Sequence, residues 1–112
     1  MNYRYKAIVR RVYDGDTITV DIDLGFNVWW RDVSLRLYGI DTPEIRGEER
    51  EEGLRSKQFV VDRLPIGEEI IIETVKDKKE KYGRYLAVVY YGSLETNLND
   101  ELLAEGMAAK YS

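Results

Sequence analysis

Apolar and polar residues alternate along much of this chain with the two-residue period that is typical of half-buried β-strands. In the clearest case, Ile18, Val20 and Ile22 are separated by polar residues, so one face of the segment is apolar. Turn signals at 14–15 and 25–27 flank this segment. The segments predicted to be strands, from alternation or from a β-forming composition, are 3–13, 18–24, 33–38, 70–75 and 86–91.

Two other segments favour helices. The charged stretch between residues 44 and 64 has apolar residues near helical spacing, and Pro65 follows it as a helix terminator. Asn99 is predicted to be the N-cap of a short helix at 100–105, and Gly106 stands where a C-terminal cap is expected.

The order of these elements predicts the fold class. Five strands, with a helix between the third and fourth and a short helix after the fifth, indicate a mainly β (α+β) protein. The specific prediction is an OB-fold, which is a five-stranded Greek-key β-barrel. We expect residues 1–112 to form a single domain, because no repeat, low-complexity tract or linker interrupts them.

The chain contains no histidine and no cysteine. This composition excludes disulfides, thiolate chemistry, a Ser-His-Asp triad and the usual nitrogen ligands of zinc. An enzyme with this sequence must work with carboxylates, Arg, Lys and Tyr, with or without a hard metal ion that prefers oxygen ligands.

The formal net charge of −4 disfavours non-specific binding of nucleic acid. The charge is uneven, however, because basic residues cluster at 76–84 and acidic residues at 48–52. The sequence has no apolar leader at its start and no apolar run long enough to span a bilayer. We therefore expect a cytoplasmic protein without a membrane partner; a secreted protein whose leader had been removed would have the same sequence.

Three short motifs carry candidate catalytic residues, and each also has a structural interpretation. DGDT at 14–17 is either a hairpin turn or a pair of carboxylates that hold a cation. In RLYGIDTPE at 36–44, the arginine is a solvated charge or a phosphate ligand, and the acidic residues either cap the next segment or act in catalysis. In KYGR at 81–84, the arginine is a loop charge or a phosphate ligand. Together the motifs supply what phosphoryl transfer needs: oxygen ligands, a candidate base and two guanidinium groups.

These motifs, in this order and spacing, resemble those of the staphylococcal nuclease (thermonuclease) family. The similarity extends from about Val12 to Ala108 and includes KYGRYLA at 81–87. It implies an OB-fold and a Ca²⁺-dependent nuclease that hydrolyses DNA and RNA with low sequence specificity. It also implies that water attacks phosphorus and that the bond to the 5′ oxygen breaks. The groove of an OB-fold favours single-stranded or frayed substrate.

The resemblance also implies a role for each matching residue. Asp16, Asp41 and the backbone carbonyl of Thr42 would bind Ca²⁺, and Asp14 would reach the ion through water. The residues that would act on the scissile phosphate or the attacking water are Arg36, Glu44 and Arg84. The candidates for other contacts with the substrate are Lys81, Tyr82 and Tyr111.

Two features depart from the family pattern. The chain stops at Ser112 without the third helix of the family; we expect a monomer, while a dimer would cover the surface that this helix leaves open. The segment 23–32 predicts a longer hairpin. Because adjacent residues of a strand face opposite sides, we expect one of Trp29 and Trp30 to lie in the core. The exposed one would be free for base stacking or self-association.

Three functions are consistent with the sequence. The first is an active metal-dependent nuclease, the second is a catalytically silent OB-fold module that binds nucleic acid, and the third is a protein-interaction domain that uses the Trp-containing hairpin. The enzyme is favoured because the chain retains the whole candidate set, namely Asp16, Arg36, Asp41, Glu44 and Arg84.

Overall fold

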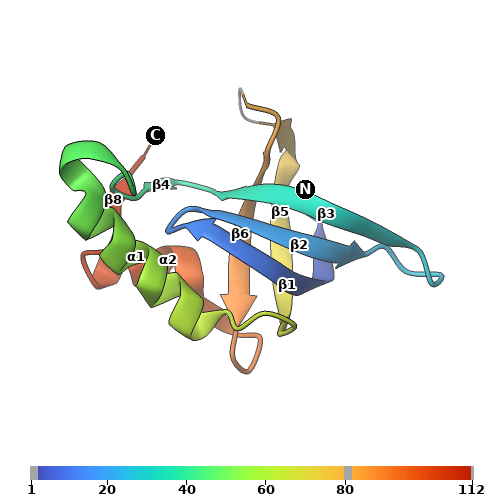
Figure 1. The fold of residues 1–112 in the computed structure, drawn as a ribbon. Helices are drawn as coiled ribbons and strands as arrows, with labels where there is room; N and C mark the ends of the chain where they lie inside the picture. Colours follow the sequence, from blue (N-terminus) through green and yellow to red (C-terminus); the bar gives the residue numbers. More distant parts are fainter. Residues whose placement is uncertain (1–2, 80–81, 112) are drawn as a thin grey trace.

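The computed structural model of the chain describes residues 3–79 and 82–111. Strands make up most of it, and the helices lie at one side (Figure 1). No helix in these residues is long and apolar enough to cross a membrane. In chain order the elements are β1 (Arg4–Asp14), β2 (Thr17–Asp23), β3 (Trp29–Leu37), β4 (Ile40–Asp41), the 3-10 helix η1 (Gly47–Glu49), α1 (Arg50–Arg63), β5 (Glu69–Lys79), β6 (Tyr85–Tyr91), β7 (Thr96–Asn97), α2 (Leu98–Ala104) and β8 (Ala109–Lys110).

The long strands close into a barrel in the order β3-β2-β1-β5-β6. Neighbouring strands pair antiparallel, except that β3 and β6 run parallel where they close the barrel. In this pairing Leu35–Leu37 lie opposite Tyr85–Ala87. With α1 between β3 and β5 and α2 after β6, the structure confirms the predicted five-stranded OB-type barrel.

Alternate residues of the strands fill the barrel, as the period-two pattern predicts. The buried side chains of the strands include Val9, Ile18, Val20, Leu35, Leu37, Ile70, Ile72 and Val89. Val60 and Leu64 of α1 and Leu98 and Leu102 of α2 join the same core and are also fully buried. Each such side chain stabilises the fold by roughly 1.5–3 kcal/mol through burial, so this apolar set fixes the barrel on which the site is built.

The cap of α2 differs from the prediction. Asn97 is the N-cap, because its side chain accepts a hydrogen bond from the backbone N–H of Asp100 at 3.0 Å. Asn99 is buried and instead accepts from the N–H of Val89 at 3.0 Å. Its side-chain amide also donates to the carbonyl of Tyr38 at 2.9 Å, which ties α2 to the segment after β3. At the other end of α2 the prediction holds, since Gly106 takes a positive φ of 72°.

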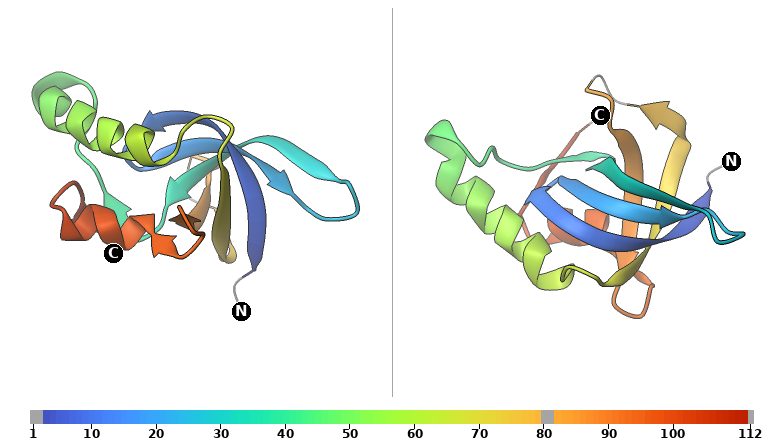
Figure 2. Two further views of the ribbon diagram at one scale, coloured as in Figure 1. Left: turned by 90° about the horizontal axis from the view of Figure 1, so that it is seen from below. Right: turned by 45° about the vertical axis from the view of Figure 1, so that its right-hand side comes forward.

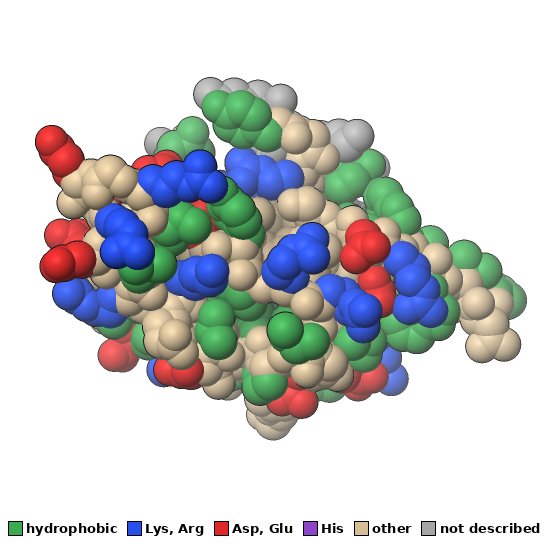
Figure 3. All heavy atoms as spheres, viewed as in Figure 1, with side chains coloured by type: hydrophobic (Ala, Val, Ile, Leu, Met, Phe, Trp, Pro, Cys, Tyr) green, Lys and Arg blue, Asp and Glu red, His purple; other side chains and the backbone are tan. Residues whose placement is uncertain are grey.

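The prediction that one tryptophan of the hairpin lies in the core is wrong. Trp29 and Trp30 are 39% and 45% exposed. They do face opposite sides of β3, but the β2–β3 hairpin projects beyond the barrel, so neither side is fully covered (Figure 2). Apolar side chains gather at its projecting end (Figure 3), where Phe26 is 100% exposed.

A buried carboxylate shapes this hairpin. The pairing of β2 with β3 shifts register between Val20 and Ile22, opposite an extra residue of β3. Asp21 lies at this bulge: its Oδ1 accepts from the N–H of Asp32 at 3.0 Å, and its Oδ2 pairs with Arg31 at 3.0 Å. The hydrogen bond from Asp32, followed by the contact with Arg31, lowers the pKa of Asp21.

Replacing Asp21 with Asn should lower the free energy of unfolding by about 1–3 kcal/mol at pH 7, because a buried charged acceptor is lost. A carboxyl whose pKa is lower in the folded state stabilises the fold above its unfolded pKa, and this contribution disappears as the pH falls. Urea denaturation should therefore show a difference between wild type and Asp21→Asn that is full at pH 7 and shrinks below about pH 4. A difference that is the same at pH 7 and pH 3 would show that the charge of Asp21 does not matter.

Candidate functional site

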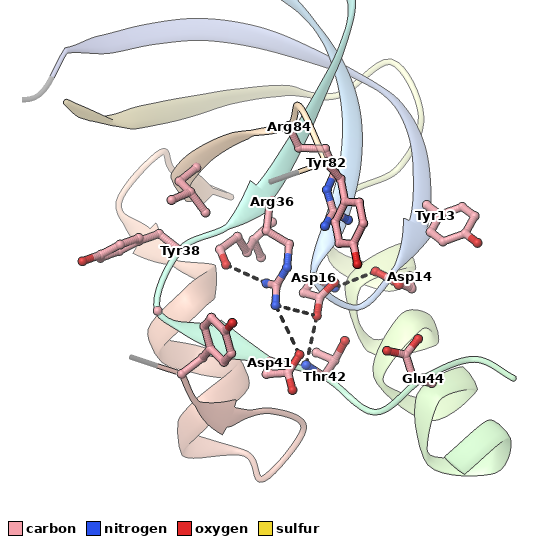
Figure 4. Close-up of a pocket in the computed structure, with 14 residues that line it drawn as sticks. Tyr13, Asp14, Asp16, Arg36, Tyr38, Asp41, Thr42, Glu44, Tyr82 and Arg84 are labelled. Carbon is pink, nitrogen blue, oxygen red and sulfur yellow. Dashed lines mark hydrogen bonds and ion pairs between the residues drawn. The ribbon is translucent and has the colours of Figure 1, made fainter. Parts of the chain in front are cut away.

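A cleft of about 790 Å³ opens where three segments of the barrel meet (Figure 4). The segments are the β1–β2 turn, the connection from β3 through β4 to Glu44, and the start of β6 with the residues before it; Tyr111, which follows β8, also lines the cleft. The predicted site residues that line it are Asp14, Asp16, Arg36, Asp41, Thr42, Glu44, Tyr82, Arg84 and Tyr111. Lys81 lies outside the described residues. The fold therefore brings parts of all three motifs into one cleft.

The turn between β1 and β2 is tightly packed. Gly15 lies against the end of β4 and against α1: a Cβ on it would be 2.8 Å from Cγ2 of Thr42 and 3.0 Å from Cβ of Ser56. Asp14 accepts a hydrogen bond from the N–H of Asp16 at 3.1 Å, as in many Asp-initiated turns. The structural interpretation of DGDT is thus correct, and the same turn aims both carboxylates into the cleft.

Asp16 is the buried centre of the site. Its Oδ1 accepts from the hydroxyl of Thr17 at 3.1 Å, and its Oδ2 accepts from the N–H of Thr42 at 3.1 Å. The same Oδ2 lies 3.4 Å from Nη2 of Arg36. These contacts join the β1–β2 turn to the segment that follows β4.

Arg36 is held in place on several sides. Its Nη1 donates to the carbonyls of Leu37 at 3.0 Å and Ile40 at 2.9 Å, and its Nη2 donates to Oδ1 of Asp41 at 3.2 Å. The side chain is only 13% exposed, whereas that of Asp41 is 55% exposed. As predicted from the alternation of β3, Arg36 leaves the face of its buried Leu neighbours; it enters the cleft as a fixed positive charge between two carboxylates.

The two carboxyls of the turn differ in acidity. Burial raises the pKa of Asp14 to about 7, and the hydrogen bond with Asp16 and its charge act in the same direction. Burial also disfavours ionised Asp16, but the hydrogen bonds from Asp14 and the Thr42 N–H and the charge of Arg36 outweigh it and lower the pKa of Asp16. Asp16 is therefore ionised at neutral pH, while Asp14 keeps its proton to a higher pH than an ordinary carboxyl.

The oxygen atoms near Asp16 suit a hard cation such as Ca²⁺ or Mg²⁺. Asp16 and Asp41 supply carboxylates, and the buried hydroxyl of Thr42 has no hydrogen-bond partner among the described residues. Within those residues, no group of three or more Asp, Glu, His or Cys side chains is placed to hold a metal. A cation here would thus need backbone, hydroxyl or water oxygens beside two carboxylates.

Glu44 reaches the cleft from a segment that lies directly on α1 (Figure 4). Its backbone N–H donates to the carboxylate of Glu49 at 3.1 Å. A Cβ at Gly53 would lie 2.0 Å from the carbonyl oxygen of Glu44, so only glycine permits this packing. The sequence analysis missed both supporting residues. A glycine inside a helical pattern was the available signal, because it weakens a helix unless a close approach requires it.

Arg84 faces the acidic residues from the other wall of the cleft (Figure 4). Its Nη1 donates to the hydroxyl of Thr17 at 3.0 Å, and its guanidinium lies 5.4 Å from the ring centre of Tyr82. Tyr82 and Tyr111 are 72% and 60% exposed. Thr17 is a further supporting residue that the sequence analysis did not single out, although it belongs to the DGDT motif.

Comparison with known proteins supports the resemblance in the sequence. Residues 34–112 match the family described as staphylococcal nuclease homologue. The chain is 35% identical over 104 residues to the thermonuclease of Staphylococcus intermedius, covering 90% of this chain and 56% of that protein. It is 36% identical over 107 residues to the thermonuclease of Staphylococcus hyicus, covering 93% and 57%.

A third relative is the uncharacterized protein MJ1439 of Methanocaldococcus jannaschii, which is 32% identical over 129 residues, covering 96% of this chain and 59% of that protein. The chain thus spans somewhat more than half the length of each of these relatives. The family match itself includes β3 from its middle onward, α1 and every later element. On this match, and on the barrel that accompanies it, the chain belongs to the family of staphylococcal nuclease homologues.

Proposed function

We propose that this protein is a Ca²⁺-dependent nuclease that hydrolyses phosphodiester bonds of DNA and RNA with low sequence specificity. Water attacks phosphorus, and the bond to the 5′ oxygen breaks. Two relatives named thermonuclease support the reaction class. We expect low sequence specificity because the charged side chains that line the cleft suit the phosphodiester backbone, and contacts with that backbone carry no direct sequence information.

The observation that carries the proposal is the arrangement around Arg36. This guanidinium is fixed by two carbonyls and by Asp41, and Arg84 lies on the other wall of the same cleft. Two guanidinium groups directed into one cleft match the oxygens of a phosphodiester, which guanidinium binds in a bidentate manner. Because both are held by other groups before substrate arrives, they need little reorganisation to stabilise charge on the phosphate.

The acidic side chains would have the two remaining roles, which are activation of water and binding of the metal ion. Glu44 is exposed in the cleft and its backbone is anchored on α1, so its carboxylate can orient a water molecule and accept its proton. Asp16 and Asp41, with the carbonyl of Thr42, would hold the Ca²⁺ ion, with Asp14 acting through water. When bound, the ion supplies positive charge that stabilises the phosphorane-like transition state. Tyr82 and Tyr111 provide aromatic walls for the adjoining nucleotide.

Removal of the metal tests the proposal directly. Chelator should abolish cleavage of single-stranded DNA, and Ca²⁺ should restore it. Asp41→Asn is the more informative variant, because Asp41 is half exposed whereas Asp16 also makes hydrogen bonds that support the fold. It should weaken Ca²⁺ binding in calorimetric titration while leaving thermal stability unchanged without metal. Full cleavage in the presence of chelator would overturn the assignment of the metal.

A further inference from the structure

A smaller cavity of about 110 Å³ is lined by residues of β1, β2, β3, β5 and β6. Ile22, Val33 and Leu35 form its floor and are almost fully buried. Leu24 and Trp30 also line it and are 44% and 45% exposed. It is therefore an apolar cavity that opens to solvent beside an aromatic ring.

The indole of Trp30 is held in a defined orientation. Its ring centre lies 5.4 Å from that of Tyr85, with an angle of 74° between the planes, which is an edge-to-face contact. Tyr85 thus contacts the indole, and 45% of Trp30 remains exposed. A large aromatic side chain that is fixed by one neighbour and open on another side is suited to stacking.

The cavity adjoins the cleft. Leu86 lines both of them. In the closing pair of strands, Leu35 lies opposite Tyr85 and Arg36 lies opposite Leu86. Tyr85 is thus one residue along β6 from the residue opposite Arg36, whereas Trp30 lies six residues before Arg36 in β3, roughly 20 Å at about 3.3 Å per residue. A substrate strand that leaves the cleft must therefore extend over several nucleotides to reach Trp30.

We propose that the opening of this cavity is an additional nucleotide subsite, in which an unpaired base of the substrate strand stacks on Trp30. The inference rests on the proposed function, since it assumes that a nucleic acid occupies the cleft. At about 110 Å³ the cavity is smaller than the roughly 150 Å³ that takes a benzene ring, so the base stays at the opening and lies on the exposed part of Trp30. Stacking on an aromatic ring does not distinguish among bases, so the subsite favours single strands without adding sequence specificity.

The neighbouring tryptophan provides a matched control. Trp29 is exposed to a similar extent, at 39%, but it does not line the cavity. It lies on the opposite side of β3, with the guanidinium of Arg31 5.6 Å from its ring centre. Any general effect of losing an exposed tryptophan from this hairpin should appear equally in Trp29→Ala and Trp30→Ala.

Kinetics with substrates of two lengths test the subsite. Trp30→Ala should raise KM for a single-stranded decanucleotide by about 5- to 100-fold, the range expected for loss of one stacked base. It should leave cleavage of a dinucleotide unchanged, because a dinucleotide bound in the cleft does not reach Trp30. Trp30→Phe should restore most of the affinity, and Trp29→Ala should resemble wild type on both substrates. Equal KM values for Trp30→Ala and Trp29→Ala on the decanucleotide would overturn the proposal.

Fluorescence gives a second readout that does not depend on cleavage. The chain has two tryptophans, so Trp29→Phe leaves Trp30 as its one indole. Decanucleotide should quench this indole within the mixing time, before turnover, and should not quench Trp29 in the Trp30→Phe variant. Quenching without any cleavage would refute the proposed nuclease but keep the subsite. Cleavage without quenching would refute the subsite but keep the proposed nuclease.

A second copy of the chain is the rival occupant, because Phe26 at the hairpin tip is fully exposed and would pack on the exposed part of Trp30. In that case the fluorescence of Trp30 would change with protein concentration when no oligonucleotide is present. Sedimentation would show a dimer that Phe26→Ala abolishes. Either result would assign the cavity to self-association and overturn the nucleotide subsite.

Discussion

Glu44→Gln is expected to lower the turnover rate on single-stranded DNA by about 10²–10⁴-fold, the usual contribution of a general base. Glutamine keeps the shape of the side chain and removes the charge that would accept the proton. The backbone contacts that hold this residue, with Glu49 and against Gly53, involve main-chain atoms and remain intact. Affinity for the substrate and thermal stability should therefore change little.

Single-turnover cleavage at saturating Ca²⁺, measured beside binding of an oligonucleotide, checks this expectation. Glu48→Gln is the matched control, because Glu48 is exposed in the same acidic segment but does not line the cleft. It should cleave like wild type. If Glu44→Gln also cleaves at the wild-type rate, the base lies elsewhere, and the carboxylate of Glu44 serves only as a surface charge.

Much of the fold follows from the sequence because its signals are local. The alternation of Ile18, Val20 and Ile22 predicts β2 correctly, since a buried face needs every second residue. Local signals fail where a contact with a residue distant in the sequence determines the structure. Asn97 and Asn99 both suit an N-cap, and the choice depends on which one reaches β6. The exposure of both tryptophans depends on how far the hairpin projects beyond the barrel.

The site likewise has some properties that the sequence predicts and others that it does not. The three motifs predict which residues gather in the cleft, because their roles require them to meet at one phosphate. They do not predict that Arg36 pairs with both Asp16 and Asp41, or that burial raises the pKa of Asp14. Those properties arise from the packing of the β1–β2 turn under Thr42, which joins residues 26 positions apart.

Gly53→Ala is expected to destabilise the protein and to slow cleavage, although alanine usually stabilises a helix by about 1 kcal/mol relative to glycine. The new Cβ would lie 2.0 Å from the carbonyl oxygen and 2.4 Å from the carbonyl carbon of Glu44, and backbone atoms cannot swing away. Either α1 or the segment that carries Glu44 must shift. Overpacking of this kind costs about 1–3 kcal/mol, which exceeds the gain in helix propensity.

The effect on catalysis should be larger than the effect on stability. A displacement of about 1 Å in a positioned group can lower a rate by about 10²-fold, so turnover should fall by that order in Gly53→Ala. Arg55→Ala, at an exposed position of the same helix, is the control for helix propensity and should retain wild-type turnover. Urea denaturation and single-turnover cleavage of both variants give the two quantities.

A double-mutant cycle tests whether Gly53→Ala slows cleavage through Glu44. If Gly53→Ala slows cleavage by displacing the carboxylate of Glu44, it should add little once Glu44→Gln has removed the charge of that carboxylate. The two losses should then be strongly non-additive in the free energy of activation. Additive losses would mean that α1 supports another part of the cleft, for which the contact between Gly15 and Ser56 is the available path. Wild-type stability and turnover in Gly53→Ala would show that the segment carrying Glu44 does not lie against α1 in solution.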